Sequence, residues 1–291
     1  MNRSIALLAV LAALSTAACA GSSSEASADS SAAATAAHPA VGHHAAVVAC
    51  EAAEKKAGET AMSTMDMVEM EGNFQDCLAK ANDAAVPVIE KLLKDNESAR
   101  IGGVKSALES ARKANQALCF ELHNASSSYG GTLQHIEDAS CIAEREHFIA
   151  AIIDDMVAFD GVEATYIKED RASHGDCYKA YDANPGESTA GMIQANGDLI
   201  ECIDKQLATV IDATAKAEVE NDASFGPQAA ANARVKSLVD AHTEKLSGFC
   251  GAIAEAGENG IGTLTRVSSA ACAVRVTEAA YTLLKQSDVQ N

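Results

Sequence analysis

Aromatic residues are scarce in this chain of 291 residues, which has no Trp, 5 Tyr and 6 Phe. Proline is also rare, with 4 residues. β-Sandwiches and β-barrels rely on aromatic side chains and on turn residues, so this composition argues against an all-β fold. The many alanines favour helices instead, and we expect an all-α protein.

Basic residues are the second shortage. The chain has 22 Lys and Arg against 41 Asp and Glu, which gives a net charge of −19. Such a charge disfavours nucleic acid and anionic membrane surfaces as partners, and it favours a basic partner. Sequence motifs of catalysis are missing too: there is no Gly-rich phosphate loop, no HExxH and no Ser-His-Asp order. We therefore expect a binding protein without catalytic residues or a cofactor.

The N-terminal segment 1–20 has the pattern of an export signal, with Arg3 before the apolar run at 5–13 and small residues after it. Two cleavage sites fit. Cleavage before Cys19 would leave a lipidated cysteine, whereas cleavage after Ala20 would release a secreted protein. Removing Cys19 leaves eight cysteines, four in each half, so we prefer lipidation. The chain is then predicted to reach the periplasm or cell envelope, with the lipid anchor as its only contact with the membrane. The Ser/Ala-rich segment 21–46 is expected to be a disordered tether.

An internal repeat dominates the rest of the chain. Cys119 and Cys141 are 22 residues apart, and so are Cys250 and Cys272. A Gly-Thr-Leu triplet lies at the same offset in both segments, so the two copies align when Cys119 is placed on Cys250. This pattern predicts two tandem helical-bundle domains at 47–165 and 172–291, each stapled by disulfides.

Hydrophobic periodicity predicts helices at 46–70, 74–94, 104–122 and 134–159 in the first copy, with a break at Gly72-Asn73 and a kink or a helix start at Pro87. In the second copy it predicts helices at 187–220 and 227–249, and it places Cys177 in a turn-rich stretch. Core positions repeat along with the cysteines, and the aligned pairs are Val104 with Val235, Leu108 with Val239, Leu118 with Phe249, and Ile152-Ile153 with Leu283-Leu284.

The eight repeated cysteines are expected to form disulfides. Eight cysteines allow 105 pairings, but only 3 remain if both copies pair alike and within themselves. We favour bonding each copy's first cysteine to its second and its third to its fourth, which gives the pairs Cys50–Cys77, Cys119–Cys141, Cys177–Cys202 and Cys250–Cys272. Bonding first with fourth and second with third remains open. Short CxxC-type spacings are missing, so we predict no metal site.

The cysteine-closed segments 120–140 and 251–271 are the candidate partner-binding loops, because they are long and rich in Gly and Ser. The candidate contact residues are Tyr129, Gly131, Thr132, Gly262 and Thr263. The alternative is that these segments only connect helices.

Methionines and histidines suggest one competing function. Met62, Met65, Met67 and Met70 form an MxxMxMxxM pattern, and thioethers are ligands for Cu(I). His38, His43 and His44 could bind a transition metal loosely, and His43 and His44 lie not far upstream of the methionines. We interpret these histidines as solvated tether residues and the methionines as core and surface residues. His242 lies on an apolar face and is expected at the edge of the core.

A helix that ends in a cysteine, a loop of roughly twenty residues with a Gly-Thr element, and a second cysteine that opens an amphipathic helix resemble the LprI-like family of bacterial envelope proteins, named for a lysozyme inhibitor. The earlier cysteines of each copy fit this pattern, so the resemblance implies two tandem copies. It also implies capture of a basic protein, with a c-type lysozyme as the first candidate. It assigns no lysozyme-contacting residue. A copper-binding or purely structural envelope protein is the alternative.

Overall fold

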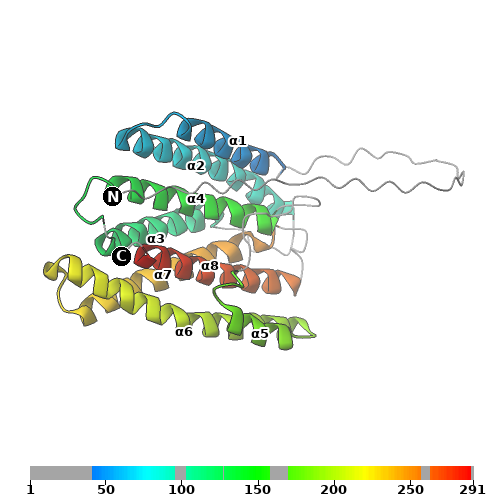
Figure 1. Cartoon of the computed structure of the whole chain (residues 1–291). Coiled ribbons are helices and arrows are strands. Elements are labelled where there is room, and N and C mark those ends of the chain that lie inside the picture. Colours follow the sequence, from blue (N-terminus) through cyan, green and yellow to red (C-terminus); the bar gives the residue numbers. More distant parts are fainter. Residues whose placement is uncertain (1–40, 96–102, 127, 158–169, 257–262, 290–291) are drawn as a thin grey trace, which may run out of the picture. The chain divides into compact units, whose positions relative to one another are not determined.

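The computed structural model describes residues 41–95, 103–126, 128–157, 170–256 and 263–289 (Figure 1). These residues form helices and contain no strand, which confirms the all-α prediction. The segment Ala37–Asn291 is one compact unit. The predicted signal, Cys19 and most of the tether lie outside the described residues. A search of the described helices found none with the length and apolar character needed to span a membrane.

The described part of the first copy consists of long helices. They are α1 (Val41–Gly58), α2 (Thr64–Asp95), α3 (Val104–Ala125) and α4 (Gln134–Val157). Helix α2 packs extensively against both α1 and α4. Their shared core includes Val47, Phe74 and Leu78, and it surrounds the bond between Cys50 and Cys77.

The second copy follows the same order with a shorter first helix. It consists of α5 (Gly175–Ala183), α6 (Thr189–Asn221), a 3₁₀ turn η1 (Ala223–Phe225), α7 (Gln228–Ala254) and α8 (Leu264–Val289). All of the aligned core residues named above are buried in both copies, so the repeat extends from the cysteines to the packing. Ser188 caps α6 by accepting a hydrogen bond from the backbone N–H of Gly191 at 3.1 Å.

The turn before α6 requires a glycine. Gly186 has a φ of +83°, which side chains other than glycine rarely adopt, and a Cβ there would lie 2.2 Å from the carbonyl carbon of Gly191. The chain can therefore enter α6 at this angle only because residue 186 has no side chain.

Three boundary predictions were wrong. Helix α1 begins at Val41, so residues 41–46 are helical rather than tether. The predicted break at Gly72-Asn73 lies inside α2, which also continues through Pro87 instead of starting there. Cys177 is in helix α5, not in a turn-rich stretch.

The true break before α2 is made by a capping box at Ser63 and Asp66. The hydroxyl of Ser63 accepts from the backbone N–H of Asp66 at 3.1 Å, and the Asp66 carboxylate accepts from the backbone N–H groups of Met62 and Ser63. These bonds hold the pKa of Asp66 below its ordinary value. The Ser-x-x-Asp pattern fixes the helix start, whereas Gly72 costs only about 1 kcal/mol within a helix that tertiary contacts support.

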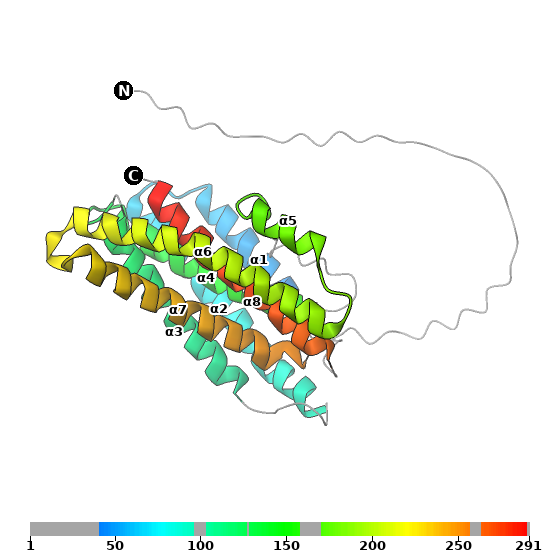
Figure 2. The same cartoon turned by 90° about the horizontal axis from the view of Figure 1, so that it is seen from below.

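The two copies share their core. One cluster combines Leu108 and Ala111 of α3 with Leu246 and Phe249 of α7. A second cluster combines Leu118 and Leu122 of α3 with Val235 and Val239 of α7. The start of α3 thus contacts the end of α7, and the end of α3 contacts the start of α7. The two helices are therefore antiparallel neighbours (Figure 2). The segments predicted as 47–165 and 172–291 are therefore joined across α3 and α7 by common apolar layers.

This packing has approximate two-fold symmetry. Leu108 lies in the contact layer of Phe249, and Val239 lies in the contact layer of Leu118. Because Leu108 corresponds to Val239 and Phe249 to Leu118 in the repeat, the two layers are related by exchange of the copies. Each copy offers the same face of its third helix to the other copy. The centre of this contact falls between residues 111 and 115 on α3, and between 242 and 246 on α7.

Candidate binding site

All eight repeated cysteines are bonded, and the pairing is the favoured one. The bonds are Cys50–Cys77, Cys119–Cys141, Cys177–Cys202 and Cys250–Cys272. Structural disulfides fit an oxidising compartment such as the periplasm or the cell exterior.

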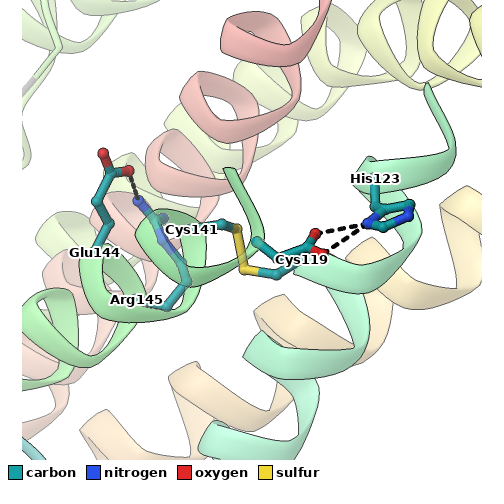
Figure 3. The surroundings of a disulfide bond; sticks show 6 residues. Cys119, His123, Cys141, Glu144 and Arg145 are labelled. Carbon is teal, nitrogen blue, oxygen red and sulfur yellow. Dashed lines mark hydrogen bonds and ion pairs between the residues drawn. A yellow bond between two sulfur atoms is a disulfide. The ribbon is translucent and has the colours of Figure 1, made fainter. Parts of the chain in front are cut away.

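The Cys119–Cys141 bond joins the last turns of α3 to the start of α4 (Figure 3). Most of the predicted loop 120–140 is helical, because α3 continues to Ala125 and α4 starts at Gln134. The connection is therefore short and ordered by its own polar groups. Gln134, for example, accepts a hydrogen bond from the backbone N–H of Gly130 at 2.9 Å.

A cleft of about 250 Å³ lies beside this disulfide, between the end of α3, the start of α4 and α8. Its lining includes His123 from α3 and the carboxylates of Glu137, Asp138 and Glu144 from α4; among the described residues, lysine and arginine do not line it. Apolar parts of the wall come from Leu122, Ile136 and Leu283. A cleft with three carboxylates and apolar walls suits a cationic side chain with an aliphatic stem.

Hydrogen bonds fix two of these carboxylates. Asp138 accepts from His123, with Nδ1 at 2.7 and 2.9 Å from its two oxygens. The hydroxyls of Ser126 and Ser128 each donate to an oxygen of Glu137. Glu144 lies at the rim with about half of its side chain exposed, and it faces Arg145 at 3.7 Å. The acidic groups are thus held in place before a partner arrives.

The residues predicted as contact residues do not gather at this cleft. Tyr129 packs edge-on against Phe225 at 5.7 Å between ring centres, and its hydroxyl donates to Asp222 at 3.4 Å. Gly131 and Thr132 are exposed on the connection. Gly262 lies outside the described residues, and Thr263 is exposed and accepts from Thr189 at 3.4 Å.

The first copy's connection is instead docked onto the second copy. Asn221 donates from Nδ2 to the backbone oxygens of Asn124 and Ser126, both at 3.0 Å. Tyr129 joins this contact through Phe225 and Asp222, so its role is to fix the hairpin against the end of α6. These contacts hold the connection between α3 and α4, which borders the cleft, against the second copy.

The second hairpin carries a different surface. A cleft of about 350 Å³ lies between α7 and α8, and its charged lining residues are Glu255 and Arg266. In the alignment of the copies, Glu137, Asp138 and Glu144 correspond to Ser268, Ser269 and Arg275. The acidic cleft is therefore a feature of the first copy. Sequence reasoning missed it, although comparing the two copies residue by residue would have shown the loss of three carboxylates.

An arginine that binds two carboxylates joins the copies near this site. Arg234 of α7 hydrogen-bonds both Glu121 of α3 and Glu218 of α6, the latter at 2.5 Å. The side chain of Glu218 is fully buried. Burial, with the nearby charge of Glu121, raises the pKa of Glu218 to about 7.

The histidines predicted in the tether proved to be structural. His43 is buried on α1 and bonds Asp154 at 2.6 Å and Asn82 at 3.0 Å, while His44 bonds the other oxygen of Asp154 at 2.9 Å. The prediction of solvated histidines was wrong for these two because the helix begins earlier than expected. His38 lies outside the described residues.

The methionine motif lies at the turn between α1 and α2. Met62 and Met65 are 90 % and 72 % exposed, Met67 is 38 % exposed, and Met70 is half-buried. Among the described residues, no three or more His, Cys, Asp or Glu side chains gather in a way that could hold a metal ion. His242, expected at the core edge, is instead fully buried.

Comparisons with known protein families, with curated proteins and with solved structures found no match to this chain.

Proposed function

We propose that this chain is an exported, non-enzymatic binding protein that captures a basic partner protein at the acidic cleft of its first copy. The observation that carries the proposal is the lining of that cleft, which includes Glu137, Asp138 and Glu144 and, among the described residues, no lysine or arginine; Arg145 faces Glu144 at 3.7 Å but is not part of the lining. A Lys or Arg side chain of the partner would place its stem against Leu122 and Leu283 and its charge among the carboxylates.

The charge of the whole chain supports this function. At −19, the protein attracts a basic partner over long distances and speeds the encounter, while the cleft supplies the short-range contact. The disulfide and the docked connection keep the carboxylates in place, which lowers the entropy cost of binding. The resemblance to the LprI-like family makes a basic c-type lysozyme the first probe, with an envelope location proposed for both partners.

The test is binding of the lysozyme to the full oxidised chain by calorimetry across a salt series. Replacing the three cleft carboxylates (Glu137→Gln, Asp138→Asn and Glu144→Gln) should weaken binding by about tenfold or more, because the bound cation of the partner would lose its carboxylate partners in a partly buried site. A matched control removes three exposed carboxylates elsewhere, at Glu201, Glu220 and Asp240.

Equal losses in the two triple variants would show that total charge alone drives binding and would contradict a role for the cleft. Thermal unfolding of both variants verifies that they fold. Absence of salt-sensitive binding to lysozyme in the wild-type chain would remove lysozyme as the partner.

A second candidate function is Cu(I) binding at the turn between α1 and α2. It is favoured by the exposure of Met62 and Met65, which leaves their thioether sulfurs accessible to a soft metal ion. A competition titration of Cu(I) against a chromogenic chelator tests it, with the double variant Met62→Leu and Met65→Leu expected to lose any uptake.

A further inference from the structure

A polar layer interrupts the apolar contact between the two copies. Asn115 of α3 lies between Ala111 and Leu118, which belong to different apolar clusters, and His242 of α7 lies between Val239 and Leu246. Because α3 and α7 are antiparallel, Asn115 and His242 fall in the same layer of their contact. The repeat places Leu246 and Ala111 at the corresponding positions, so an apolar layer was sterically available.

Neither side chain in this layer has a protein partner among the described residues. Asn115 is 3 % exposed, and both its amide nitrogen and its amide oxygen lack a hydrogen bond. His242 is fully buried, and both ring nitrogens lack one. A buried polar group without a hydrogen bond costs about 1–3 kcal/mol, so two such groups in one layer call for a hydrogen-bonding partner from outside the chain.

Arg145 brings a positive charge to the same region. Its Nε and Nη1 atoms are buried and make no hydrogen bond to another described group, and α4, which carries it, packs against α7. Burial, and to a lesser extent the charge of Arg145, lowers the pKa of His242 to about 3, which keeps the imidazole neutral.

The pairing of Arg145 differs from that of the other half-buried arginines. Arg112, Arg234 and Arg275 have 24 %, 35 % and 22 % of their side chains exposed, and each hydrogen-bonds a carboxylate. Arg145 is only 11 % exposed, yet the carboxylate it faces is that of Glu144 at 3.7 Å, beyond hydrogen-bonding distance (Figure 3). In a chain with 41 acidic residues, the most buried of these four guanidinium groups has no described carboxylate within hydrogen-bonding distance.

We propose that the layer formed by Arg145, Asn115 and His242 binds a small monovalent anion of chloride size between the two copies. Arg145 supplies the charge through Nε and Nη1, and Asn115 and the neutral His242 each supply an N–H donor. The ion pair with Glu144 engages Nη2 of Arg145 at 3.7 Å, and the anion would give the buried Nε and Nη1 a negatively charged acceptor, which water cannot be because it carries no net charge.

Thermal unfolding of the full oxidised chain tests the proposal. Sodium chloride and sodium bromide are compared with sodium gluconate at equal ionic strength, since gluconate is too large for the layer. Chloride at tenfold excess over its Kd should raise Tm by about 3–5 °C for a chain of this size. The rise should vanish in Arg145→Met, which keeps the apolar stem, and persist in Arg275→Met, which removes a guanidinium paired with Asp155.

Bromide in crystals of the wild-type chain gives an answer that does not depend on the variants. An anomalous peak within bonding distance of Arg145 and His242 supports the proposal. A halide effect without that peak, or one retained in Arg145→Met, overturns it, as does equal stability in chloride and gluconate. Those outcomes would assign the layer to water. Lysozyme binding is measured separately, so failure of one proposal leaves the other standing.

Discussion

Glu218→Gln is expected to change the pH dependence of stability. Glu218 is fully buried, and its pKa is raised from 4.5 to about 7, first by burial and then by the charge of Glu121. A carboxyl group with a raised pKa in the folded state holds its proton more tightly there than in the unfolded chain. Its contribution is therefore fully present below about pH 4.5 and is lost as pH rises through 7.

The size of the effect follows from the shift. Each pKa unit corresponds to 1.36 kcal/mol, so a shift of roughly 2.5 units makes the free energy of unfolding fall by about 3 kcal/mol between pH 4.5 and the mildly alkaline range. In Glu218→Gln a neutral amide accepts from Arg234 and donates to Glu121 at every pH. We expect this variant to be more stable than the wild type by up to about 3 kcal/mol at pH 8, and close to it at pH 4.5.

Urea unfolding of the oxidised chain at pH 4.5 to 8, followed by circular dichroism at 222 nm, measures this difference. Other carboxyl groups with raised pKa values, including Glu278, contribute to both curves and cancel in the subtraction. Glu220→Gln, at an exposed position on the same helix, is the control and should leave the curve unchanged. If the curves of Glu218→Gln and the wild type run parallel, Glu218 does not titrate as described and the reasoning is refuted.

Three further substitutions probe the fold. Replacing Cys119 and Cys141 together with Ser should lower the free energy of unfolding in urea by about 3 kcal/mol, as expected for a closed loop of this length; no loss would mean that the unfolded chain is not constrained by this bond. His43→Ala removes one of the hydrogen-bond partners of buried Asp154 and should lower the free energy of unfolding by about 2–4 kcal/mol in the same assay. A decrease below about 1 kcal/mol would contradict a stabilising role for this bond between α1 and α4. Gly186→Ala should lower Tm through its clash with Gly191, whereas Gly197→Ala, with open space around it on α6, should leave Tm unchanged or raise it; similar effects at both sites would exclude the clash.

The repeat made much of the fold predictable. The helical class and the repeated buried positions follow from periodicity and from the match between the two copies, and the structure confirms them. The match between the copies reduced the cysteine pairings to three, and the structure has the favoured one. The helix start at Thr64 could also have been predicted from the sequence, because Ser63 and Asp66 form a local capping box. It was missed because Gly72 was weighed as a helix breaker, although α2 gains its stability from packing against α1 and α4.

The candidate site was predictable only in part. The sequence indicates that the segment closed by Cys119 and Cys141 matters, but it does not show that most of this segment is helical, or that Tyr129 turns toward the second copy. Contacts between residues far apart in the chain, such as Tyr129 with Asp222, depend on how the copies pack. The burial of Asn115 and His242 in one layer likewise follows from the register of α3 and α7, which hydrophobic periodicity within one helix does not reveal.

The two-fold contact of α3 with α7 has a consequence for how this chain could have arisen. A lone copy would leave one apolar face of its third helix uncovered, so we expect that a single-copy ancestor assembled as a homodimer through that face. Fusing two subunits into one polypeptide removes the requirement that both have the same sequence. In this chain the first half alone carries Glu137, Asp138 and Glu144, the second half alone carries His242, and each of these residues has to fit only one side of the contact. Covalent linkage of the two halves thus allows a fold with two-fold symmetry to have different side chains on its two halves.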